Sequence, residues 1–349
     1  MIFYYDQEMN VYKTQMEAMM RRHDNNFFFY YHDDIFNKFD WTTEPSESLE
    51  ELNRIRAQEI RDLYDYVILC YSGGHDSTNV LETFYYNKIH IDEIVMVGSF
   101  SQDPNQTTDE NRNAEIYLNC FPTLKNMDLP KTKISLVDYS EFFRDTNDLS
   151  LLKNHGNEWI RHVGVQRSAF NIFWHDFKQL VGAKNEKKTC YVFGCDKLGY
   201  TKILKDGKKK SCFRINDAII LGYGGTREME NYKRVDFYIS PETTSMNIMK
   251  KQAHILHRCE QLGLFEVGMS RDLWEPAYER IIYANLKNQI NFESTKAVYS
   301  AISGRDNFIW NRAEGTDIHK LYVEGLKDLS SFANIPPKPV TFSRPYFIE

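Results

Sequence analysis

Residues 66–77 constrain the fold more than any other stretch of the chain. An apolar run from Tyr66 to Tyr71 predicts a buried strand, which a turn at Ser72-Gly73-Gly74 interrupts. A segment with helical character, 78–87, begins soon afterwards. A strand, a glycine turn and a helix start together predict an anion site. The glycines let a ligand approach the backbone, and the helix N-terminus offers unpaired N–H groups.

Polar side chains in this stretch strengthen that prediction. Ser72 and Ser77 supply hydroxyl donors, and Asp76 supplies a carboxylate that could hold Mg²⁺ carried on phosphates. The spacing is not that of the Walker loop, which needs four residues between its glycines and then Gly-Lys-Ser/Thr. The alternative is a plain Gly-Gly turn between a strand and a helix.

Strands and helices alternate after this loop. Strands are expected at 91–98, ending in Gly98-Ser99, and at 133–137, with a helix at 109–119 between them. A fourth strand from Cys190 to Phe193 precedes Gly194-Cys195-Asp196-Lys197. This β-α-β-α-β order predicts an α/β fold with a doubly wound, mainly parallel sheet, whose ligands lie beyond the carboxyl ends of the strands. The loops at 72–77, 98–99 and 138–139 would share that edge.

The chain divides into three predicted regions. Residues 1–64 form an N-terminal extension with a strand around 27–31, a turn at Asp33-Asp34 and a packing helix that ends near Leu63, with start signals at Pro45 and Ser46. Residues 65–240 form the nucleotide-binding α/β domain, which includes a patterned helix at 158–181 and further strands at 211–221 and 234–239. Residues 241–349 form a mostly helical C-terminal region, with helices at 243–262 and 272–288.

Composition narrows the cellular setting and the partners. The net charge of −6 gives no global case for nucleic-acid binding, so nucleic acid stays open but unsupported. The six cysteines form no Cys-x-x-Cys pair, which argues against zinc or iron–sulfur ligation and fits reduced thiols in the cytoplasm. The N-terminus lacks the features of a signal peptide, and no apolar run is long enough to span a membrane. A homodimer is left open.

Two further segments carry alternatives. The basic stretch 202–210 is either a lid or nucleic-acid contact or, as we favour, an ordinary hairpin tip. His254 and His257, with Cys259 close by, could bind a metal, but they lack a partner pair of ligands, so a metal site is not favoured.

The motif Ser-Gly-Gly-x-Asp-Ser at 72–77 resembles the PP-loop of the N-type ATP pyrophosphatases. That superfamily includes asparagine synthetase, GMP synthetase, argininosuccinate synthetase, tRNA lysidine synthetase and the phosphoadenylyl-sulfate reductases. The layout, with a helix before the motif and Lys251-Gln-Ala-His254 late in the chain, looks like unassigned PP-loop proteins of bacteriophages. The resemblance covers mainly residues 66–200. It implies a Rossmann-like fold that uses ATP and Mg²⁺.

The resemblance also implies a reaction and a set of site residues. A substrate carbonyl or carboxyl oxygen would attack the α-phosphate of ATP, pyrophosphate would leave, and ammonia or an amine would then displace AMP. The substrate would be an unidentified small molecule or nucleobase. Asp76 and Lys197 are the expected catalytic residues, with Asp76 also the metal ligand. The expected nucleotide-binding residues are Ser72, Gly73, Gly74, Ser77, Gly98, Ser99, Gly194 and Asp196.

Two other functions compete with this ligase-like or amidotransferase-like activity. A sulfur-handling enzyme of the reductase type would need a reactive thiol, and Cys195 is the best candidate, although the Glu-Cys-Gly-x-His ending of those reductases is missing. A non-catalytic nucleotide-binding module, as in universal stress proteins, uses different glycine patterns, and the intact Asp76 argues against it.

Overall fold

The computed structural model describes the chain in several stretches, and our structural statements concern these residues alone. They are residues 3–12, 18, 21, 26–98, 115–138, 187–194, 198–217, 232–269, 271–288, 290 and 341–349. The predicted helix at 158–181 and site residues Ser99, Asp196 and Lys197 lie outside the described residues, as does Cys195.

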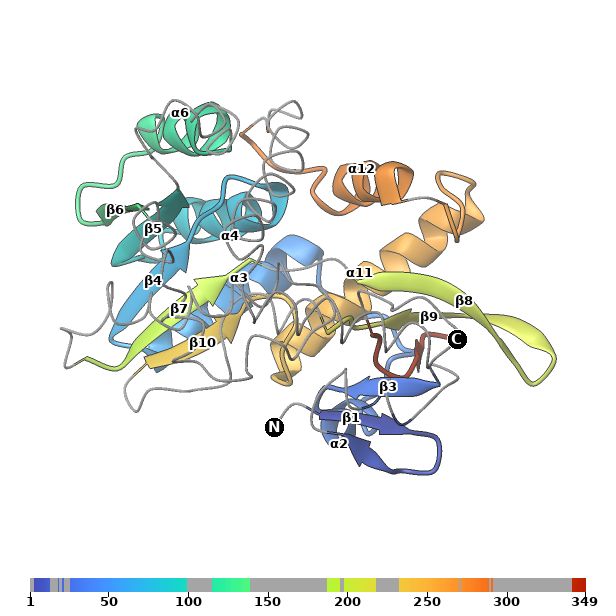
Figure 1. Cartoon of the computed structure of the whole chain (residues 1–349). Coiled ribbons are helices and arrows are strands. Elements are labelled where there is room, and N and C mark those ends of the chain that lie inside the picture. The colour runs from blue at the N-terminus through green and yellow to red at the C-terminus, as the bar shows by residue number, and fades with distance from the viewer. Residues whose placement is uncertain are drawn as a thin grey trace, which may run out of the picture.

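A five-stranded parallel sheet is the centre of the molecule (Figure 1). Its strands are β4 (Tyr66–Cys70), β5 (Glu93–Gly98), β6 (Lys133–Asp138), β7 (Thr189–Phe193) and β10 (Tyr232–Asp236). Their order across the sheet is β10-β7-β4-β5-β6, and every neighbouring pair is parallel. The chain therefore runs outward in one direction from β4 to β6 and in the other from β7 to β10, which is the doubly wound arrangement that the sequence predicted. The reversal of strand order lies between β4 and β7, where such sheets bind ligands.

Helices flank this sheet and follow the polar and apolar pattern of the sequence. Helix α3 (Leu49–Leu63) precedes β4, and its N-cap is Ser48, whose hydroxyl accepts a hydrogen bond from the Glu51 backbone N–H at 3.1 Å. The start signals at Pro45 and Ser46 were thus two to three residues early, because Ser48 is the residue whose side chain caps the helix. Helix α4 (His75–Tyr86) follows the glycine turn.

The remaining helices complete the layers. The short π-helical turn η1 (Ile116–Cys120) and α6 (Phe121–Lys125) lie between β5 and β6, where a helix was expected at 109–119. Helix α11 (Thr243–Gln261) matches the helix predicted at 243–262 and packs against α3, whereas α12 (Arg271–Ile282) ends six residues before the predicted end at 288. None of these described helices combines the length and the apolar character needed to cross a membrane.

A small antiparallel sheet stands at the N-terminus. It contains β1 (Phe3–Asp6), β2 (Val11–Tyr12) and β3 (Phe27–Tyr30) in the order β2-β1-β3. The predicted turn at Asp33-Asp34 is instead a single helical turn, α2 (Asp33–Phe36). Asp33 is buried there and accepts hydrogen bonds from the hydroxyls of Tyr5 and Tyr346, so it anchors this sheet to the end of the chain.

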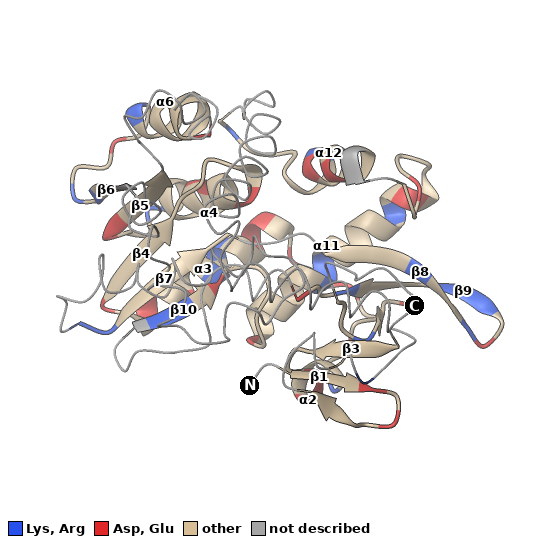
Figure 2. Cartoon of the chain, in the orientation of Figure 1, with Lys and Arg blue, Asp and Glu red and all other residues tan. Residues whose placement is uncertain are grey.

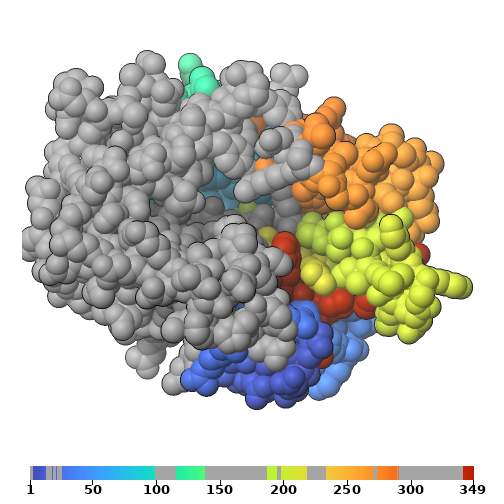
Figure 3. All heavy atoms as spheres, turned by 45° about the vertical axis from the view of Figure 1, so that its right-hand side comes forward, coloured from blue at the N-terminus to red at the C-terminus, as the bar shows by residue number. Residues whose placement is uncertain are grey.

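The stretch 202–210 forms the end of a β-hairpin, as favoured. Strands β8 (Gly199–Lys205) and β9 (Lys208–Arg214) pair antiparallel, and both contain lysines, which are blue in Figure 2. The strand expected at 211–221 therefore begins earlier and ends at Arg214, and the one expected at 234–239 is β10, which ends at Asp236. The last strand, β11 (Tyr346–Phe347), pairs with β9 and lies between the hairpin and the N-terminal sheet (Figure 3).

One buried cluster joins these parts, with members from Tyr4 to Ile348. It includes residues of the N-terminal sheet, the parallel sheet and α11. The three-region division at residues 64/65 and 240/241 stays a prediction.

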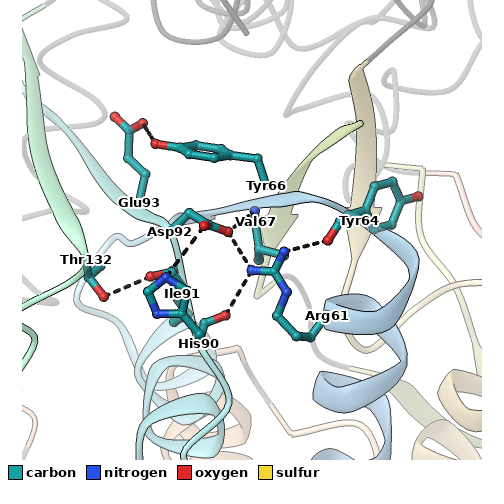
Figure 4. A network of polar contacts seen from close by, with 9 residues as sticks. All are labelled: Arg61, Tyr64, Tyr66, Val67, His90, Ile91, Asp92, Glu93 and Thr132. Atoms are coloured by element: carbon teal, nitrogen blue, oxygen red, sulfur yellow. Dashed lines mark hydrogen bonds and ion pairs between the residues drawn. The ribbon is translucent and has the colours of Figure 1, made fainter. Parts of the chain in front are cut away.

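A polar network fixes the end of the sheet that lies opposite the glycine turn (Figure 4). The Arg61 guanidinium, from the end of α3, contacts the Asp92 carboxylate at 2.5 Å and the Tyr64 carbonyl oxygen at 2.5 Å. The same carboxylate accepts a hydrogen bond from the Val67 backbone N–H at 2.8 Å. The network thus joins the end of α3 to the starts of β4 and β5.

Candidate functional site

The turn after β4 has the geometry of an anion cradle. Gly73 has a φ of +83°, a conformation that glycine adopts without the steric cost of a side chain. The Ser77 hydroxyl lies 3.0 Å from the Ser72 hydroxyl and 3.2 Å from the Gly74 carbonyl oxygen, so the two serines close the turn. Gly74 is the N-cap of α4 and has no side chain to cap it, which leaves the first N–H groups of the helix for a ligand.

Close packing explains why residue 73 is a glycine. A Cβ there would lie 2.8 Å from Cys120 Sγ and 2.9 Å from the Glu115 carbonyl oxygen. The turn therefore rests against η1, and no side chain fits between them. A Cβ at Gly74 would meet only ordinary contacts, at 3.6 Å from the Ser72 hydroxyl and 3.9 Å from a Glu115 carboxylate oxygen. Glu115 is a carboxylate beside the cradle that the sequence analysis missed.

Gly194 brings the loop after β7 against the same turn. A Cβ on Gly194 would lie 2.8 Å from Ser77 Cα and 2.9 Å from the Asp76 carbonyl carbon and oxygen. These are backbone atoms, so the close approach requires a glycine. The structure thus brings together Ser72, Gly73, Gly74, Asp76, Ser77 and Gly194. Gly98 ends β5 on the same edge of the sheet, level with Asp138.

Two tyrosines from later in the chain hold Asp76. The Tyr283 hydroxyl donates a hydrogen bond to Asp76 Oδ1, and the Tyr238 hydroxyl donates one to the Asp76 carbonyl oxygen at 3.0 Å. Asn79 in turn donates to the Tyr238 hydroxyl at 2.7 Å. Burial, followed by the nearby Asp76 charge, raises the pKa of Tyr283 well above its ordinary value. Tyr283 therefore stays protonated and acts as a donor.

His75, the variable residue of the motif, faces a carboxylate. Its Nδ1 lies 3.4 Å from a Glu279 carboxylate oxygen, and both side chains are only 10% exposed. Glu279 and Tyr283 are four residues apart, so both lie on the face of α12 and its extension that meets the start of α4. The sequence showed this spacing, but nothing in it linked these two residues to the motif.

The segment after α12 continues along α4. The Glu82 carboxylate accepts hydrogen bonds from the Lys287 backbone N–H at 2.9 Å and from the Asn288 backbone N–H at 2.7 Å. The Asn288 side-chain amide adds a third, at 2.7 Å. The stretch 279–288 therefore covers α4 along its length and forms one wall of the site.

The described cysteines do not have the chemistry of reactive thiols. Cys70, Cys120, Cys190 and Cys212 are buried, and burial raises the pKa of each thiol, to about 12 at Cys190 and about 11 at Cys212. Cys259 is half-buried and its thiol pKa is also raised, chiefly by burial. A reactive thiolate would need the opposite shift.

No cluster of three or more potential metal-ligating side chains occurs among the residues that the structure describes. His254 Nε2 lies 3.0 Å from the Trp41 carbonyl oxygen, and His257 Nδ1 lies 3.0 Å from the hydroxyls of Tyr200 and Ser211. These contacts join helix α11 to its neighbours. Asp76 alone still fits Mg²⁺, which takes one or two carboxylates from a protein and completes its shell with phosphates and water.

Comparisons with known proteins add a distant structural likeness. No protein-family model and no curated protein matches the chain. A solved structure described as NAD+ synthetase from Burkholderia pseudomallei is similar over 86% of this chain and 95% of that chain, with 10% sequence identity and a TM-score of 0.31. We draw no conclusion from a likeness at this score. The strand order of the sheet establishes the fold class, and the candidate site is identified from its own geometry.

Proposed function

We propose that the chain is an ATP-dependent adenylating enzyme of the PP-loop type, which converts ATP to AMP and pyrophosphate. The observation that carries this proposal is the Ser72–Ser77 turn at the reversal of strand order, closed by its two serines and backed by Gly194. A cradle of backbone N–H groups at that position suits the β- and γ-phosphates of a nucleotide.

In this proposal the cradle holds the part of ATP that leaves. The N–H groups of Gly73 and Gly74 and the hydroxyls of Ser72 and Ser77 bind the pyrophosphate portion, which leaves the α-phosphorus open to attack. Asp196 and Lys197 lie two and three residues after Gly194 in the sequence, and we assign Lys197 to the charge that grows on the phosphates. Gly98 and Ser99 would lie against the adenosine, where small residues permit close approach.

Asp76 is the proposed ligand for Mg²⁺. The Tyr283 hydroxyl donates a hydrogen bond to Asp76 Oδ1 and so helps to fix the orientation of this carboxylate. When bound, the cation would neutralise charge on the phosphates. The protein's own contribution is to orient Asp76 and to hold the phosphates by fixed dipoles.

The proposed reaction balances in two steps. A substrate carbonyl or carboxyl oxygen forms a bond to the α-phosphorus as the bond to the bridging oxygen of pyrophosphate breaks. Ammonia or an amine then attacks the activated carbon, loses a proton, and releases AMP with the original oxygen. The acceptor is an unidentified small molecule or nucleobase.

The test is the identity of the nucleotide product. The protein is incubated with α-labelled ATP and Mg²⁺, with and without a cell extract, and AMP is resolved from ADP. We expect AMP and pyrophosphate, lost in Asp76→Asn and kept in Asp128→Asn, which changes an exposed aspartate in the loop after α6. ADP as the product would refute the proposal.

Two other results would favour the competing functions. AMP formation that depends on an added thiol and disappears in Cys195→Ser would favour the sulfur-handling enzyme. Tight ATP binding without turnover in any extract would favour the non-catalytic module.

A further inference from the structure

The β8–β9 hairpin gathers positive charge on an otherwise acidic protein. Its stretch 202–210 holds five lysines and one aspartate, whereas the whole chain carries a net charge of −6. The residues from Leu204 to Lys209 are exposed, and Leu204 is 70% exposed. This concentration of charge is local, and screening over a Debye length of about 8 Å keeps the acidic remainder of the surface from cancelling it.

The hairpin is a regular two-stranded arm with a tight turn at its tip. Lys205 pairs with Lys208 across a two-residue turn of Asp206 and Gly207, whose φ angles are +52° and +74°. Positive φ at both turn residues is the geometry of the tight hairpin turn that matches strand twist. Register fixes which lysines share a face: Lys205, Lys208 and Lys210 lie on one face and Lys209 on the other.

The base of the hairpin is anchored to the body. His257 on α11 contacts the hydroxyls of Tyr200 and Ser211, and Lys202 forms an ion pair with Glu260 at 2.5 Å. The arm extends from this base, away from the rest of the described chain (Figures 1 and 3). Lys205 lies 4.2 Å from the centre of the Phe347 ring. No ion pair within the described residues involves Lys208, Lys209 or Lys210, so these charges are available to a partner.

The position of the arm connects it to the nucleotide site. Strand β8 begins at Gly199, five residues after Gly194, which packs on the Ser72–Ser77 turn. The hairpin therefore leaves the sheet from the edge that carries the site.

We propose that the tip of this hairpin binds the phosphate backbone of a nucleic acid. Lysines act on phosphates as point charges and release condensed counterions, which gives affinity without base specificity. A two-stranded ribbon is also narrow enough for the major groove of duplex DNA. Residues 202–210 include no aromatic side chain for stacking on bases, so the contact is with the backbone. This binding does not depend on the proposed adenylation. If both proposals hold, the substrate of the adenylation would be a nucleobase within a nucleic-acid chain.

The experiment compares two triple variants that change the net charge equally. One is Lys208→Gln, Lys209→Gln and Lys210→Gln; the control is Lys38→Gln, Lys125→Gln and Lys131→Gln, at exposed lysines of other elements. Binding of a fluorescent single strand and a duplex of about 20 nucleotides is followed by anisotropy between roughly 50 and 200 mM salt. We expect the hairpin variant to lose at least about tenfold in affinity at low salt. Its slope of log K against log[salt] should be smaller by about 2 on the single strand, because each lost phosphate contact removes about 0.7.

The proposal is overturned by any of three results. Equal losses in both variants would show a general effect of net charge. No binding of either nucleic acid by the unmodified protein would remove the partner altogether. Binding only to vesicles of phosphatidylserine and phosphatidylcholine would identify a membrane surface instead. Far-UV circular dichroism of both variants separates these outcomes from misfolding, and ATP turnover, measured in parallel, shows whether the proposed function fails independently.

Discussion

Tyr283 is the residue through which the C-terminal region acts on the site. Its hydroxyl donates to Asp76, and the acceptor is the carboxylate on which the proposed Mg²⁺ binding depends. A hydrogen bond to a charged group contributes about 1.5–3 kcal/mol, and this one also helps to hold the carboxylate in one orientation. We expect Tyr283→Phe to raise the Mg²⁺ concentration needed for half-maximal ATP binding by roughly tenfold, as measured by calorimetry across a magnesium series.

Tyr278→Phe is the matched control for that variant. Tyr278 is as deeply buried as Tyr283 and also donates a hydrogen bond, at 3.2 Å, but to Gln252 and not to Asp76. Both variants should lose a little stability, and only Tyr283→Phe should shift the magnesium dependence. An equal shift in the two would mean that Tyr283 is a packing residue.

At this scale the sequence predicted the contiguous half of the candidate site, and the structure places those residues together. Ser72, Gly73, Gly74, Asp76 and Ser77 lie in one motif, and Gly194 follows a recognisable strand, so both could be predicted. Tyr283 is 207 positions from Asp76, and Tyr238 is 162 positions away. No local pattern encodes a contact over such distances, because it depends on how α12 packs on α4.

At the scale of elements, Arg61 determines how α3, β4 and β5 meet (Figure 4). Its guanidinium and the Asp92 carboxylate are 19% and 18% exposed, so the pair is largely desolvated. Replacing Arg61 removes both the cation that faces the Asp92 carboxylate and the donor to the Tyr64 carbonyl oxygen. We expect Arg61→Met to lower the free energy of unfolding by about 2–4 kcal/mol in urea titrations.

Arg54→Met provides the comparison on the same helix. Arg54 pairs with Glu51 at 2.6 Å, but both side chains are 44% exposed. Exposed pairs contribute about 0–1 kcal/mol because water solvates the separated charges nearly as well. Similar losses of unfolding free energy in both variants would contradict the view that the Arg61 network stabilises the protein because it is buried.

The order of the elements could be predicted from sequence better than their arrangement. The alternation of apolar runs and helical patterns predicted β4 to β7 and the helices α3, α11 and α12. Strand β11 has only two residues, too few to show a periodicity, and it exists because β9 offers an edge for it. The pairing of β1 with β3 likewise joins residues 3–6 to residues 27–30, with β2 between them in sequence, and no local pattern encodes that pairing.

For the molecule as a whole, an aromatic cluster joins the two ends of the chain. Tyr346 of β11 lies 5.4 Å from Phe36, 5.6 Å from Trp41 and 5.4 Å from Phe213, measured between ring centres. It is only 3% exposed, and its hydroxyl donates to Asp33. Helix α2 and Trp41 near the N-terminus, strand β9 of the basic hairpin and the C-terminal strand therefore share one set of contacts.

If these contacts make the chain one cooperative unit, weakening them should destabilise all of it together. Tyr346→Ala removes a buried ring, and we expect a loss of about 3–5 kcal/mol in the free energy of unfolding. Tryptophan fluorescence and far-UV circular dichroism should still report a single, coincident urea transition, moved to lower urea. Tyr117→Ala, at a ring that is 39% exposed, should leave the midpoint nearly unchanged. Separate transitions in Tyr346→Ala would instead show that the regions divided at residues 64/65 and 240/241 unfold as independent domains, because each would then keep its own stability when the shared cluster is lost.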